Sequence, residues 1–521
     1  MAANFALVSV FDKTGVSDLV KVLVSLGYKI ISTGGTAKTL TEANIPVIPI
    51  QEITGNPESF DGRMKTISFQ IESGILFDRQ NPSHCREAKK LGIKPIDIVV
   101  CNLYPFEQTI AKRGVLLGDA VENIDVGGPT MVRAAAKNFG NVLVVVDPWD
   151  YPKLIKALKA DKVTDKMRKE LAAKAFAHLS FYDSQIARFL GKGQLFPKEL
   201  TIPGRKTISL RYGENPQQKA AFYLEPNSPS PLGKLQKLWG RDLSLINLTD
   251  INAGLESVRP FNPRRDGVAA VVVKHNSPCG IALGSSSAQA LGLAIEADPE
   301  SAFGGVIVLN HILDLEAAKI IAAFRDKQKG NIDIIAAPKV KSAALKLLQA
   351  VRKSMGIYTF GSIAGEEKLN TKWVGGGFIL QTADNVAKDG FLKWRVVTKK
   401  KPTRKQLEQM KIAWKFITRI RSNSVIVVDK DLPMTRGIGS GQTSRFRSTK
   451  IALAQAGKHV KGAILGSDSF FPFPDSVKEA AKYGIGAIVQ QGDSINDQAS
   501  IDEANRVGIP MVFTGRRAFW H

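Results

Sequence analysis

Short apolar runs alternate with amphipathic helical stretches through the first 150 residues of the chain. Each run is followed by a turn that contains glycine, hydroxyl or other polar residues, and the runs lie at residues 6–10, 29–31, 96–100 and 141–146. Buried strands that alternate with helices indicate a parallel, doubly wound sheet. Because ligands of such sheets bind beyond the carboxyl ends of the strands, we expect functional residues in the turns that follow the runs.

The pattern changes further along the chain. An amphipathic helical stretch reaches residue 190, a linker containing glycine and proline follows, and mixed strand and helix patterns then continue through a composition break at residues 394–403. A chain of 521 residues is too long for one hydrophobic core. We therefore predict an N-terminal α/β domain, a helical connector and two further α/β lobes, over residues 1–148, 149–200, 201–392 and 393–521. No strong internal sequence repeat relates the lobes.

The formal net charge of +24 raises the question of nucleic-acid binding. The basic residues are dispersed, however, and the densest run is Lys399-Lys400-Lys401, with no arginine-rich tail, aromatic RNA-binding motif or zinc-finger spacing. We therefore expect a solvated basic surface and no specific nucleic-acid partner. Three scattered cysteines fit a reduced compartment, and neither a signal peptide nor a bilayer-spanning apolar run of ~18–20 residues is evident. These features predict a cytoplasmic protein without a membrane partner.

Two neighbouring turns of the first domain are candidates for phosphate binding. The sequence Ser32-Thr-Gly-Gly-Thr36 lies between a strand and a helix, where backbone N–H groups can hold a phosphate. An ordinary strand-to-helix turn with an N-cap residue would have the same kind of sequence. The turn at residues 12–15, however, is expected next to the turn at residues 32–36, at the end of the adjacent strand. Two such loops suit a phosphorylated ligand. The candidate binding residues here are Ser9, Lys13, Ser32, Thr33, Gly34, Gly35 and Thr36.

Further polar turns are expected at the same edge of this sheet. Arg63-Met-Lys-Thr66 places two cations and a hydroxyl in one turn, residues 101–106 present an amide and a phenol, and residues 124–128 precede a helix that bears Lys137. A single such residue is usually structural, whereas several loops that meet at one edge indicate a site. The candidates added by these loops are Arg63, Lys65, Thr66, Asn102, Tyr104, Asp125, Gly127 and Lys137.

Residues 6–137 resemble the cyclohydrolase half of the bifunctional phosphoribosylaminoimidazolecarboxamide (AICAR) formyltransferase / IMP cyclohydrolase family, and the resemblance continues to His521. It is carried by the blocks LRYGENP at 210–216, KHNSPCG at 274–280, SAFGG at 301–305, SNS at 422–424, GIGSGQ at 437–442 and SDSFFPF at 467–473. It implies a methylglyoxal-synthase-like parallel sheet followed by two cytidine-deaminase-like α/β lobes without zinc.

The resemblance also implies the activity and its partners. The expected reactions are formyl transfer from 10-formyltetrahydrofolate to AICAR and then dehydrative ring closure of the formylated product, FAICAR, to IMP. No metal is expected to take part. The expected assembly is a homodimer whose formyltransferase sites are shared between subunits.

The resemblance assigns the formyltransferase residues. Lys274 and His275 would be catalytic, because formyl transfer to a weakly nucleophilic amine needs a proton shuttle and stabilisation of oxyanion charge. The nucleotide would contact Arg211, Tyr212, Gly304, Asp333 and Arg517, of which the two arginines suit a phosphate. The folate would contact Asn423, Gln442, Arg445, Phe470 and Asp475, the last at the pterin edge.

Ring closure would use Lys65 and Lys137 as oxyanion stabilisers, with Asp125 and Tyr104 handling protons. The family usually carries histidines next to this site, where the present chain has Ile67-Ser-Phe-Gln-Ile-Glu72. We expect Glu72 to pair with Arg63 and so to help fix the loop; a position against the nucleotide phosphate would instead weaken binding.

Of three alternatives to this assignment, two remain open and one is excluded. The N-terminal domain could be a phosphate-binding module attached to a working formyltransferase. A basic nucleic-acid-binding protein would account for the net charge. Zinc-dependent deamination is excluded, because Cys279 is not followed by a second cysteine at the required spacing and His275 is not part of a His-x-Glu motif.

Overall fold

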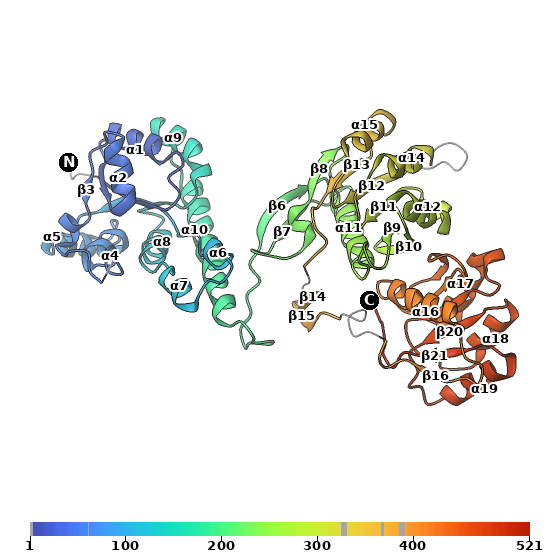
Figure 1. The fold of residues 1–521 in the computed structure, drawn as a ribbon. Coiled ribbons are helices and arrows are strands. Elements are labelled where there is room, and N and C mark those ends of the chain that lie inside the picture. The colour runs from blue at the N-terminus through green and yellow to red at the C-terminus, as the bar shows by residue number, and fades with distance from the viewer. Residues whose placement is uncertain (1–3, 61, 325–330, 366–368, 385–390) are drawn as a thin grey trace. The chain divides into compact units, whose positions relative to one another are not determined.

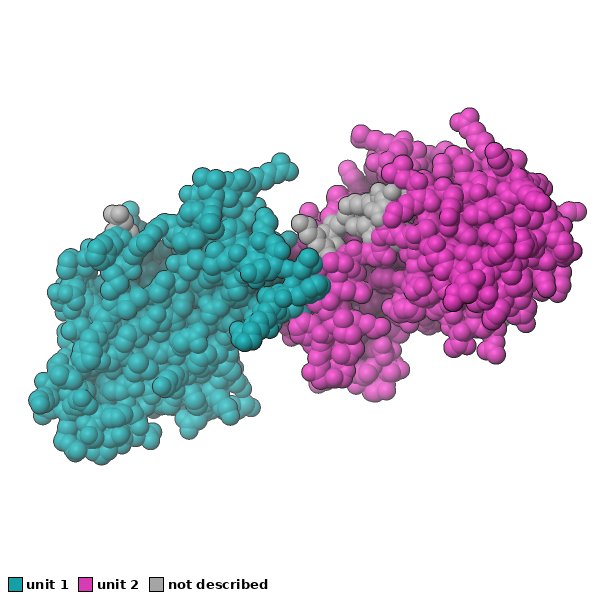
Figure 2. Space-filling model, turned by 90° about the horizontal axis from the view of Figure 1, so that it is seen from below, with its two compact units in different colours: residues 1–205, 225–227 teal, residues 206–224, 228–521 magenta. Residues whose placement is uncertain are grey.

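The computed structural model describes residues 4–60, 62–324, 331–365, 369–384 and 391–521 (Figure 1). The chain forms two compact units, coloured separately in Figure 2. Unit 1 comprises Met1–Arg205 with Glu225–Asn227, and unit 2 comprises Lys206–Leu224 with Ser228–His521.

Unit 1 contains a five-stranded sheet in which every neighbouring pair of strands is parallel. Its order is β3-β2-β1-β4-β5, with β1 Phe5–Val10, β2 Lys29–Ser32, β3 Ile48–Pro49, β4 Ile96–Asn102 and β5 Leu143–Val145. The four apolar runs of the sequence form β1, β2, β4 and β5, whose residues are nearly all buried. The predicted doubly wound parallel sheet is therefore confirmed.

Helices cover both faces of this sheet. They are α1 Val16–Ser25, α2 Gly34–Glu42, α3 Gln51–Thr54, α4 Phe69–Leu76, α5 Pro82–Lys90, α6 Phe106–Ile110, α7 Leu117–Glu122, α8 Gly127–Lys137, the short η1 Pro148–Asp150, α9 Tyr151–Lys159 and α10 Asp165–Leu190. Ala6 and Val8 of β1 pack in one core layer with α1 and α9, whereas Leu7 packs in the other with α8 and α10. Residues 149–200, expected as a connector, thus supply a helix to each layer of unit 1.

Unit 2 contains two mixed sheets with the same topology. The first lobe has the order β10-β9-β11-β12-β13-β8 and the second has β18-β17-β19-β20-β21-β16. In each lobe an antiparallel hairpin is followed by three mutually parallel strands, and an antiparallel strand closes the far edge. The two expected α/β lobes are present, and they are topological copies of one another.

The strands of the first lobe are β8 Gln236–Trp239, β9 Val268–Lys274, β10 Ser277–Gly284, β11 Gly305–Leu309, β12 Ile332–Ala337 and β13 Gly356–Thr359, and its helices are α11 Leu245–Val258, α12 Ser287–Ala297, α13 Pro299–Ala302, α14 Leu315–Ala323 and α15 Ser342–Val351. The strands of the second lobe are β16 Arg395–Val396, β17 Val425–Val428, β18 Thr435–Gly439, β19 Ile464–Ser467, β20 Ala487–Gln490 and β21 Met511–Phe513, and its helices are α16 Arg404–Ile417, α17 Arg445–Ala456, α18 Asp475–Lys482 and α19 Asp497–Val507. Outside these sheets lie the two-stranded pairs β6 Arg205–Leu210 with β7 Ala220–Leu224 and β14 Leu369–Val374 with β15 Gly377–Thr382, and the short helices η2 Pro231–Lys234 and η3 Gly457–His459.

The two lobes join through their hairpins and through a shared core. Ala282 of β10 forms an antiparallel bridge to Met434, and the N–H of Leu283 donates to the carbonyl of Pro433 at 2.8 Å. Beneath this junction α11 and α16 contribute to one hydrophobic cluster, in which the rings of Phe261 and Phe416 lie 5.5 Å apart. The lobes are thus fixed to each other within unit 2.

Each lobe packs a helix directly on a glycine of its hairpin. A Cβ atom at Gly280 would lie 2.1 Å from the carbonyl oxygen of Ala294 in α12, and a Cβ at Gly437 would lie 2.0 Å from that of Ala452 in α17. These glycines occupy equivalent strand positions, opposite Val272 and Val427. The close approach of helix to strand is therefore part of both copies of the fold.

Gly280→Ala is expected to destabilise unit 2 by about 1–3 kcal/mol, because the added methyl group overpacks the contact between β10 and α12. The matched control is Gly292→Ala in the same helix, where a Cβ meets nothing within 4 Å. That control is expected to be neutral or stabilising, by up to about 1 kcal/mol, since alanine is the better helix former. Urea unfolding of both variants tests the difference, and equal stability would contradict the close packing.

Candidate active sites

A cavity of about 790 Å³ lies at the carboxyl ends of the strands of unit 1. Its walls are the turns after β1, β2 and β4, the turn at residues 62–66 and the start of α8. Most of the candidates that the sequence placed at this edge line it, namely Ser9, Lys13, Thr33, Gly34, Gly35, Thr36, Arg63, Lys65, Thr66, Asn102, Tyr104, Asp125 and Gly127.

The turn between β2 and α2 has the features of an anion site. The hydroxyl of Thr33 is buried without a hydrogen-bond partner, and α2 begins directly after it at Gly34. A Cβ at Gly34 would meet the Nζ of Lys65 at 2.8 Å, so that ammonium lies over the first turn of the helix. Free backbone N–H groups, an unpartnered hydroxyl and a cation together suit a phosphate.

Asn102 holds the neighbouring loop. Its side-chain oxygen accepts from the N–H groups of Phe11 and Asp12 at 2.7 and 2.8 Å. The hydroxyl of Thr36 in turn accepts from the N–H of Val10 and donates to the carbonyl of the same residue. The side chains of Asn102 and Thr36 thus fix the backbone of residues 10–12, which forms part of the cavity wall.

Both cations of the turn at residues 62–66 are paired with carboxylates that also line the cavity. Lys65 Nζ lies 3.0 Å from an oxygen of Glu58, and the guanidinium of Arg63 pairs with Glu122. No sequence pattern marks Glu58 or Glu122 as site residues, because nothing in their local sequence shows which cations they face.

Asp125 caps the helix that closes the cavity. Its Oδ1 accepts from the N–H of Gly128 at 2.9 Å, and its own N–H donates to the hydroxyl of Tyr182 in α10 at 2.7 Å. Burial raises the pKa of Asp125, against the opposing effect of the Gly128 and Gly127 N–H groups. Tyr104 lies across the same cavity, 45 % exposed, with its ring 4.5 Å from that of Phe11. A carboxyl group and a phenol are thus available for proton transfer.

Two of the expected residues lie outside this cavity. Lys137 is the last residue of the 11-residue helix α8 and is exposed, about 15 Å along the helix axis from Gly127. The hydroxyl of Ser32 is buried and donates to the carbonyl of Val8 at 2.7 Å, so it links β2 to β1. The structure therefore does not bring either side chain to the candidate site.

The expected pairing of Glu72 with Arg63 is wrong. Arg63 pairs with Glu122, while Glu72 lies in the first turn of α4 with one carboxylate oxygen buried and without a hydrogen-bond partner. Burial raises the pKa of Glu72 to about 7. Glu72 does not line the cavity either, so it does not face a phosphate there.

Glu72→Gln is expected to stabilise unit 1 more at pH 8 than at pH 5. The folded-state pKa of about 7 lies above the ordinary value of 4.5, so the folded chain binds the extra proton and loses stability as the pH rises through that range. Glutamine removes this loss. Thermal unfolding at both pH values measures the effect, with the exposed Glu170→Gln on α10 as control. An equal change at both pH values would contradict a buried, titrating Glu72.

In the first lobe of unit 2 the expected catalytic pair lies on the turn between β9 and β10. His275 is exposed, and the Nζ of Lys274 donates to the carbonyl of Phe303 at 2.8 Å. Gly304, with φ 71°, follows Phe303 and precedes β11, and Asp333 lies at the start of β12. All four residues belong to the same edge of the sheet.

Two further contacts complete this edge. Arg241 pairs with Asp333 through a 2.8 Å contact, and no sequence signal marked Arg241. Arg211 lies 4.9 Å from the ring centroid of Tyr212, and its Nη2 is 3.5 Å from the side-chain oxygen of Asn247 in α11. Arg211 and Tyr212, the expected residues that follow β6, thus lie beside α11.

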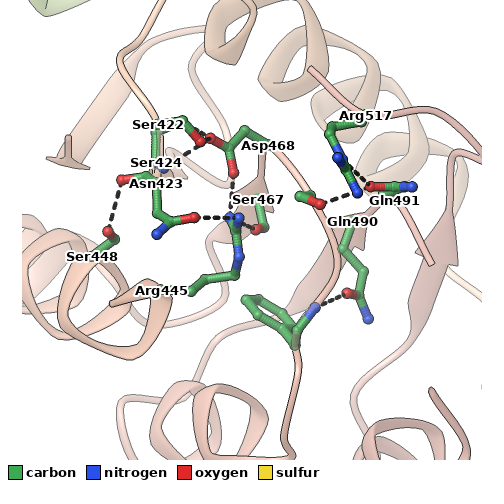
Figure 3. A network of polar contacts seen from close by, with 12 residues as sticks. Ser422, Asn423, Ser424, Arg445, Ser448, Ser467, Asp468, Gln490, Gln491 and Arg517 are labelled. Atoms are coloured by element: carbon green, nitrogen blue, oxygen red, sulfur yellow. Dashed lines mark hydrogen bonds and ion pairs between the residues drawn. The ribbon is translucent and has the colours of Figure 1, made fainter. Parts of the chain in front are cut away.

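In the second lobe a polar network surrounds Asp468, at the end of β19 (Figure 3). Asp468 is fully buried and accepts from the N–H and the hydroxyl of Ser424 at 2.9 and 3.0 Å. Arg445 pairs with Asp468 and donates to the side-chain oxygen of Asn423 at 2.7 Å, while Asn423 donates to the carbonyl of Gln442 at 3.0 Å. The expected residues Asn423, Gln442 and Arg445 are therefore held together by a carboxylate that the sequence analysis did not assign.

The remaining expected residues lie along the same edge of the second lobe. The guanidinium of Arg517 is 6.0 Å from the ring centroid of Phe470. It contacts the side chain of Gln491 at 3.4 Å (Figure 3). Asp475 is the first residue of α18 and accepts from the N–H of Ser476 at 2.7 Å. This edge therefore offers an aromatic ring, a cation and a carboxylate.

The candidate edges of the two lobes of unit 2 meet. The hydroxyl of Ser277, at the start of β10, lies 3.3 Å from that of Ser440, which follows β18. Ser277 closes the turn that carries Lys274 and His275, and Ser440 stands two residues before Gln442. The turn of the first lobe and the network of the second thus belong to one region.

Over the residues that the structure describes, no group of three or more His, Cys, Asp or Glu side chains is placed to hold a metal ion. Cys279 donates to the carbonyl of Val272 at 3.4 Å. None of the described helices is both long and apolar enough to cross a membrane.

Comparisons with known proteins cover almost the whole chain. Residues 135–455 match the family described as AICARFT/IMPCHase bienzyme, and residues 15–130 match the MGS-like domain. The Bifunctional purine biosynthesis protein PurH of Bacillus mycoides (strain KBAB4) is 43% identical over 524 residues, 99% of each chain. The proteins of the same name from Bacillus cereus (strain B4264) and Bacillus anthracis (strain A0248) show the same identity and coverage. A solved structure described as "Crystal structure of ForH" is 34% identical over 36% of this chain and 96% of that one, with a TM-score of 0.33.

Proposed function

This chain belongs to the AICARFT/IMPCHase bienzyme family, and we propose that each of its two compact units carries one of the two reactions. The chain is a bifunctional enzyme of purine biosynthesis, an AICAR formyltransferase and an IMP cyclohydrolase. Unit 1 closes the ring and unit 2 transfers the formyl group. The observation that carries this division is the separation of two candidate sites, a cavity beside α2 and α8 and a turn at Lys274-His275, into different units.

In unit 2, formyl transfer forms a bond between the amine nitrogen of AICAR and the formyl carbon. 10-Formyltetrahydrofolate supplies the formyl group: the bond between the formyl carbon and N10 of the folate breaks, and tetrahydrofolate leaves with the proton that the amine gives up. His275 takes the proton that leaves the amine, and the ammonium of Lys274 stabilises the charge that develops on the formyl oxygen. The exposed position of His275 on its turn and the fixed direction of Lys274 toward the Phe303 carbonyl support these roles.

The two substrates are held by opposite lobes. We assign AICAR to Arg211, Tyr212, Gly304 and Asp333 of the first lobe, with Arg517 reaching it from the second. We assign the folate to Asn423, Gln442, Arg445, Phe470 and Asp475. The ring of Phe470 suits a flat pterin, and the buried network of Asp468 keeps the polar groups beside it in one arrangement.

In unit 1, ring closure joins the carboxamide nitrogen of FAICAR to the formyl carbon, and water leaves. Holding the two groups in contact supplies much of the acceleration of such an intramolecular step. We assign the phosphate to the first turn of α2, proton transfer to Asp125 and Tyr104, and stabilisation of the oxyanion to Lys65. Lys137 takes no part in this assignment, because α8 carries it away from the cavity.

Substitutions at the two sites are expected to separate the activities. His275→Ala is expected to lower formylation of AICAR by about 10²- to 10⁴-fold, the usual contribution of a proton shuttle, while cyclisation of supplied FAICAR stays near that of the unaltered enzyme. Asp125→Asn is expected to give the reverse pattern. The two reactions are assayed separately on each purified variant. Loss of both activities in a folded variant would contradict the two-site division, and absent cyclisation in the unaltered enzyme would leave unit 1 as a binding module.

We also propose that the enzyme is a homodimer with shared formyltransferase sites. The hairpin of β14 and β15 supports this, because it pairs with no other described strand and exposes Trp373, Val374 and Ile379 by 70, 46 and 54 %. An isolated two-stranded hairpin is marginally stable in water. Trp373 lies on one face of the hairpin and Val374 and Ile379 on the other, so a second copy of the chain that packs around the hairpin would stabilise it.

Replacing Trp373 and Ile379 together by glutamate is expected to weaken the dimer at least about tenfold, since two charges would be buried in an apolar interface. Formylation is expected to fall with the dimer fraction, and cyclisation is not. Sedimentation equilibrium measures the association, and Trp149→Glu in unit 1, where the side chain is 89 % exposed, is the control. A dimer of unchanged strength would show that the hairpin is not the interface, and a monomeric unaltered enzyme would contradict the assembly.

A further inference from the structure

The turn that carries Lys274 and His275 has an unusual backbone. It joins the antiparallel strands β9 and β10 through His275 and Asn276, whose φ angles are 56° and 61°. Two left-handed residues in a row make the tightest hairpin turn, in which asparagine and glycine are the usual pair. Residues other than glycine are disfavoured in this conformation, so the surrounding structure must hold the turn in place.

Asp250 supplies that support from another element. It lies in α11 and is 4 % exposed, and its Oδ1 accepts from the N–H of Asn276 at 2.6 Å. Burial raises the pKa of this carboxyl, and the N–H of Asn276, the charge of His275 and the N–H of His275 oppose that rise. The carboxylate therefore points at the backbone of the turn and not at the surface.

The helix that carries Asp250 is itself fixed. Ser244 and Asn247 form a capping box at the start of α11, and Ile251 and Leu255 are buried in the core shared by both lobes. A Cβ at Gly254 would lie 2.4 Å from a methyl group of Val308 in β11, so the helix lies tightly on the sheet. Asp250 thus links the turn to a rigid base that does not depend on the substrate.

We propose that Asp250 is a positioning residue of the formyltransferase site, which holds the turn of residues 274–277 so that the side chains of Lys274 and His275 face the reacting groups. This inference rests on the roles proposed above for Lys274 and His275. Because Asp250 acts through the backbone of the turn, its loss misplaces the catalytic pair and leaves the residues assigned to AICAR and folate in place. The expected effect is on kcat and not on KM.

The test compares three variants of the full chain. Asp250→Ala is expected to lower kcat for formylation by about 10- to 100-fold, the scale of a small misplacement of catalytic groups, with the KM values for AICAR and 10-formyltetrahydrofolate within about twofold of the unaltered enzyme. Asp250→Asn keeps an acceptor oxygen and is expected to retain most of kcat. Adding Asn276→Gly to Asp250→Ala is expected to restore part of kcat, because glycine adopts the left-handed conformation without steric cost.

Asp314→Ala is the matched control. Asp314 likewise accepts from a backbone N–H, that of Ala317 at the start of α14, at 2.9 Å, and it belongs to the same lobe. It is expected to lower thermal stability without changing kcat for formylation. Cyclisation of supplied FAICAR gives the concentration of active enzyme in every preparation. If Asp250→Ala does not fold, Asp250→Ser replaces it, since the serine hydroxyl is too short to reach the N–H of Asn276.

The outcomes separate the two proposals. Formylation that survives His275→Ala would overturn the proposed role of His275, on which this inference rests. If His275→Ala abolishes formylation while Asp250→Ala keeps its full kcat, the positioning role is wrong. A fall in kcat that neither asparagine at residue 250 nor glycine at residue 276 relieves, or that comes with an equal rise in KM, would make Asp250 a structural residue only.

Discussion

Buried side-chain oxygens that accept backbone N–H groups hold each candidate site of this enzyme. Asn102 fixes the loop after β1, Asp125 the start of α8, Asp250 the turn after β9 and Asp468 the segment before β17. At the edge of a sheet the strands have ended, so the backbone groups of the loops lack their ladder partners and an unpaired buried group is costly. A short acceptor side chain from a neighbouring element meets that need and fixes the loop in one conformation. The candidate catalytic side chains can then remain exposed while their backbone is rigid.

The two lobes of unit 2 have the same fold but carry their candidate residues at opposite edges of the sheet. They share a topology and the close contact of a hairpin glycine with a helix, yet the first lobe places its candidates at the turn between its hairpin strands and the second at the opposite edge. In the second lobe, the end of β17 that corresponds to Lys274 carries Asp429, which is paired with Arg436 at 2.7 Å. The lobes join through β10 and β18. The hairpin turn of the first lobe therefore lies next to the opposite edge of the second lobe, where Ser277 and Ser440 are 3.3 Å apart. Two lobes of the same topology, with candidate residues at opposite edges, thus bring together the residues assigned to two different substrates.

The sequence predicted the elements well, since a buried parallel sheet needs apolar strands with polar turns at their ends, and these turns contain most of the residues that line the cavity of unit 1. The sequence predicted poorly which side chains contact one another. No sequence signal marks the buried or paired residues that support the sites, because their partners lie far away in the chain. These residues are Glu58, Glu122, Arg241, Asp250 and Asp468. Glu72 was given the wrong partner for the same reason. The position of Lys137 could have been foreseen, since a helix that begins at Gly127 advances about 1.5 Å per residue and must carry its last residue away from the site. The repeated topology left no trace in the sequence because it requires only the order of the elements and the apolar pattern of each.

The charges of the unit 1 cavity show that the net charge of +24 has its origin elsewhere. Of the described residues that line the cavity, three are cations (Lys13, Arg63 and Lys65) and three are acidic (Glu58, Glu122 and Asp125). A phosphate that enters must compete with Glu58 for Lys65 and with Glu122 for Arg63, while the first turn of α2 and the hydroxyl of Thr33 have no such competitor. On the proposed assignment, affinity for the phosphate depends first on the helix N-terminus, with its fixed N–H groups, and only secondly on the cations. The carboxylates lower the attraction for anions in general, so the cavity favours a ligand that also satisfies the groups around Asp125 and Tyr104.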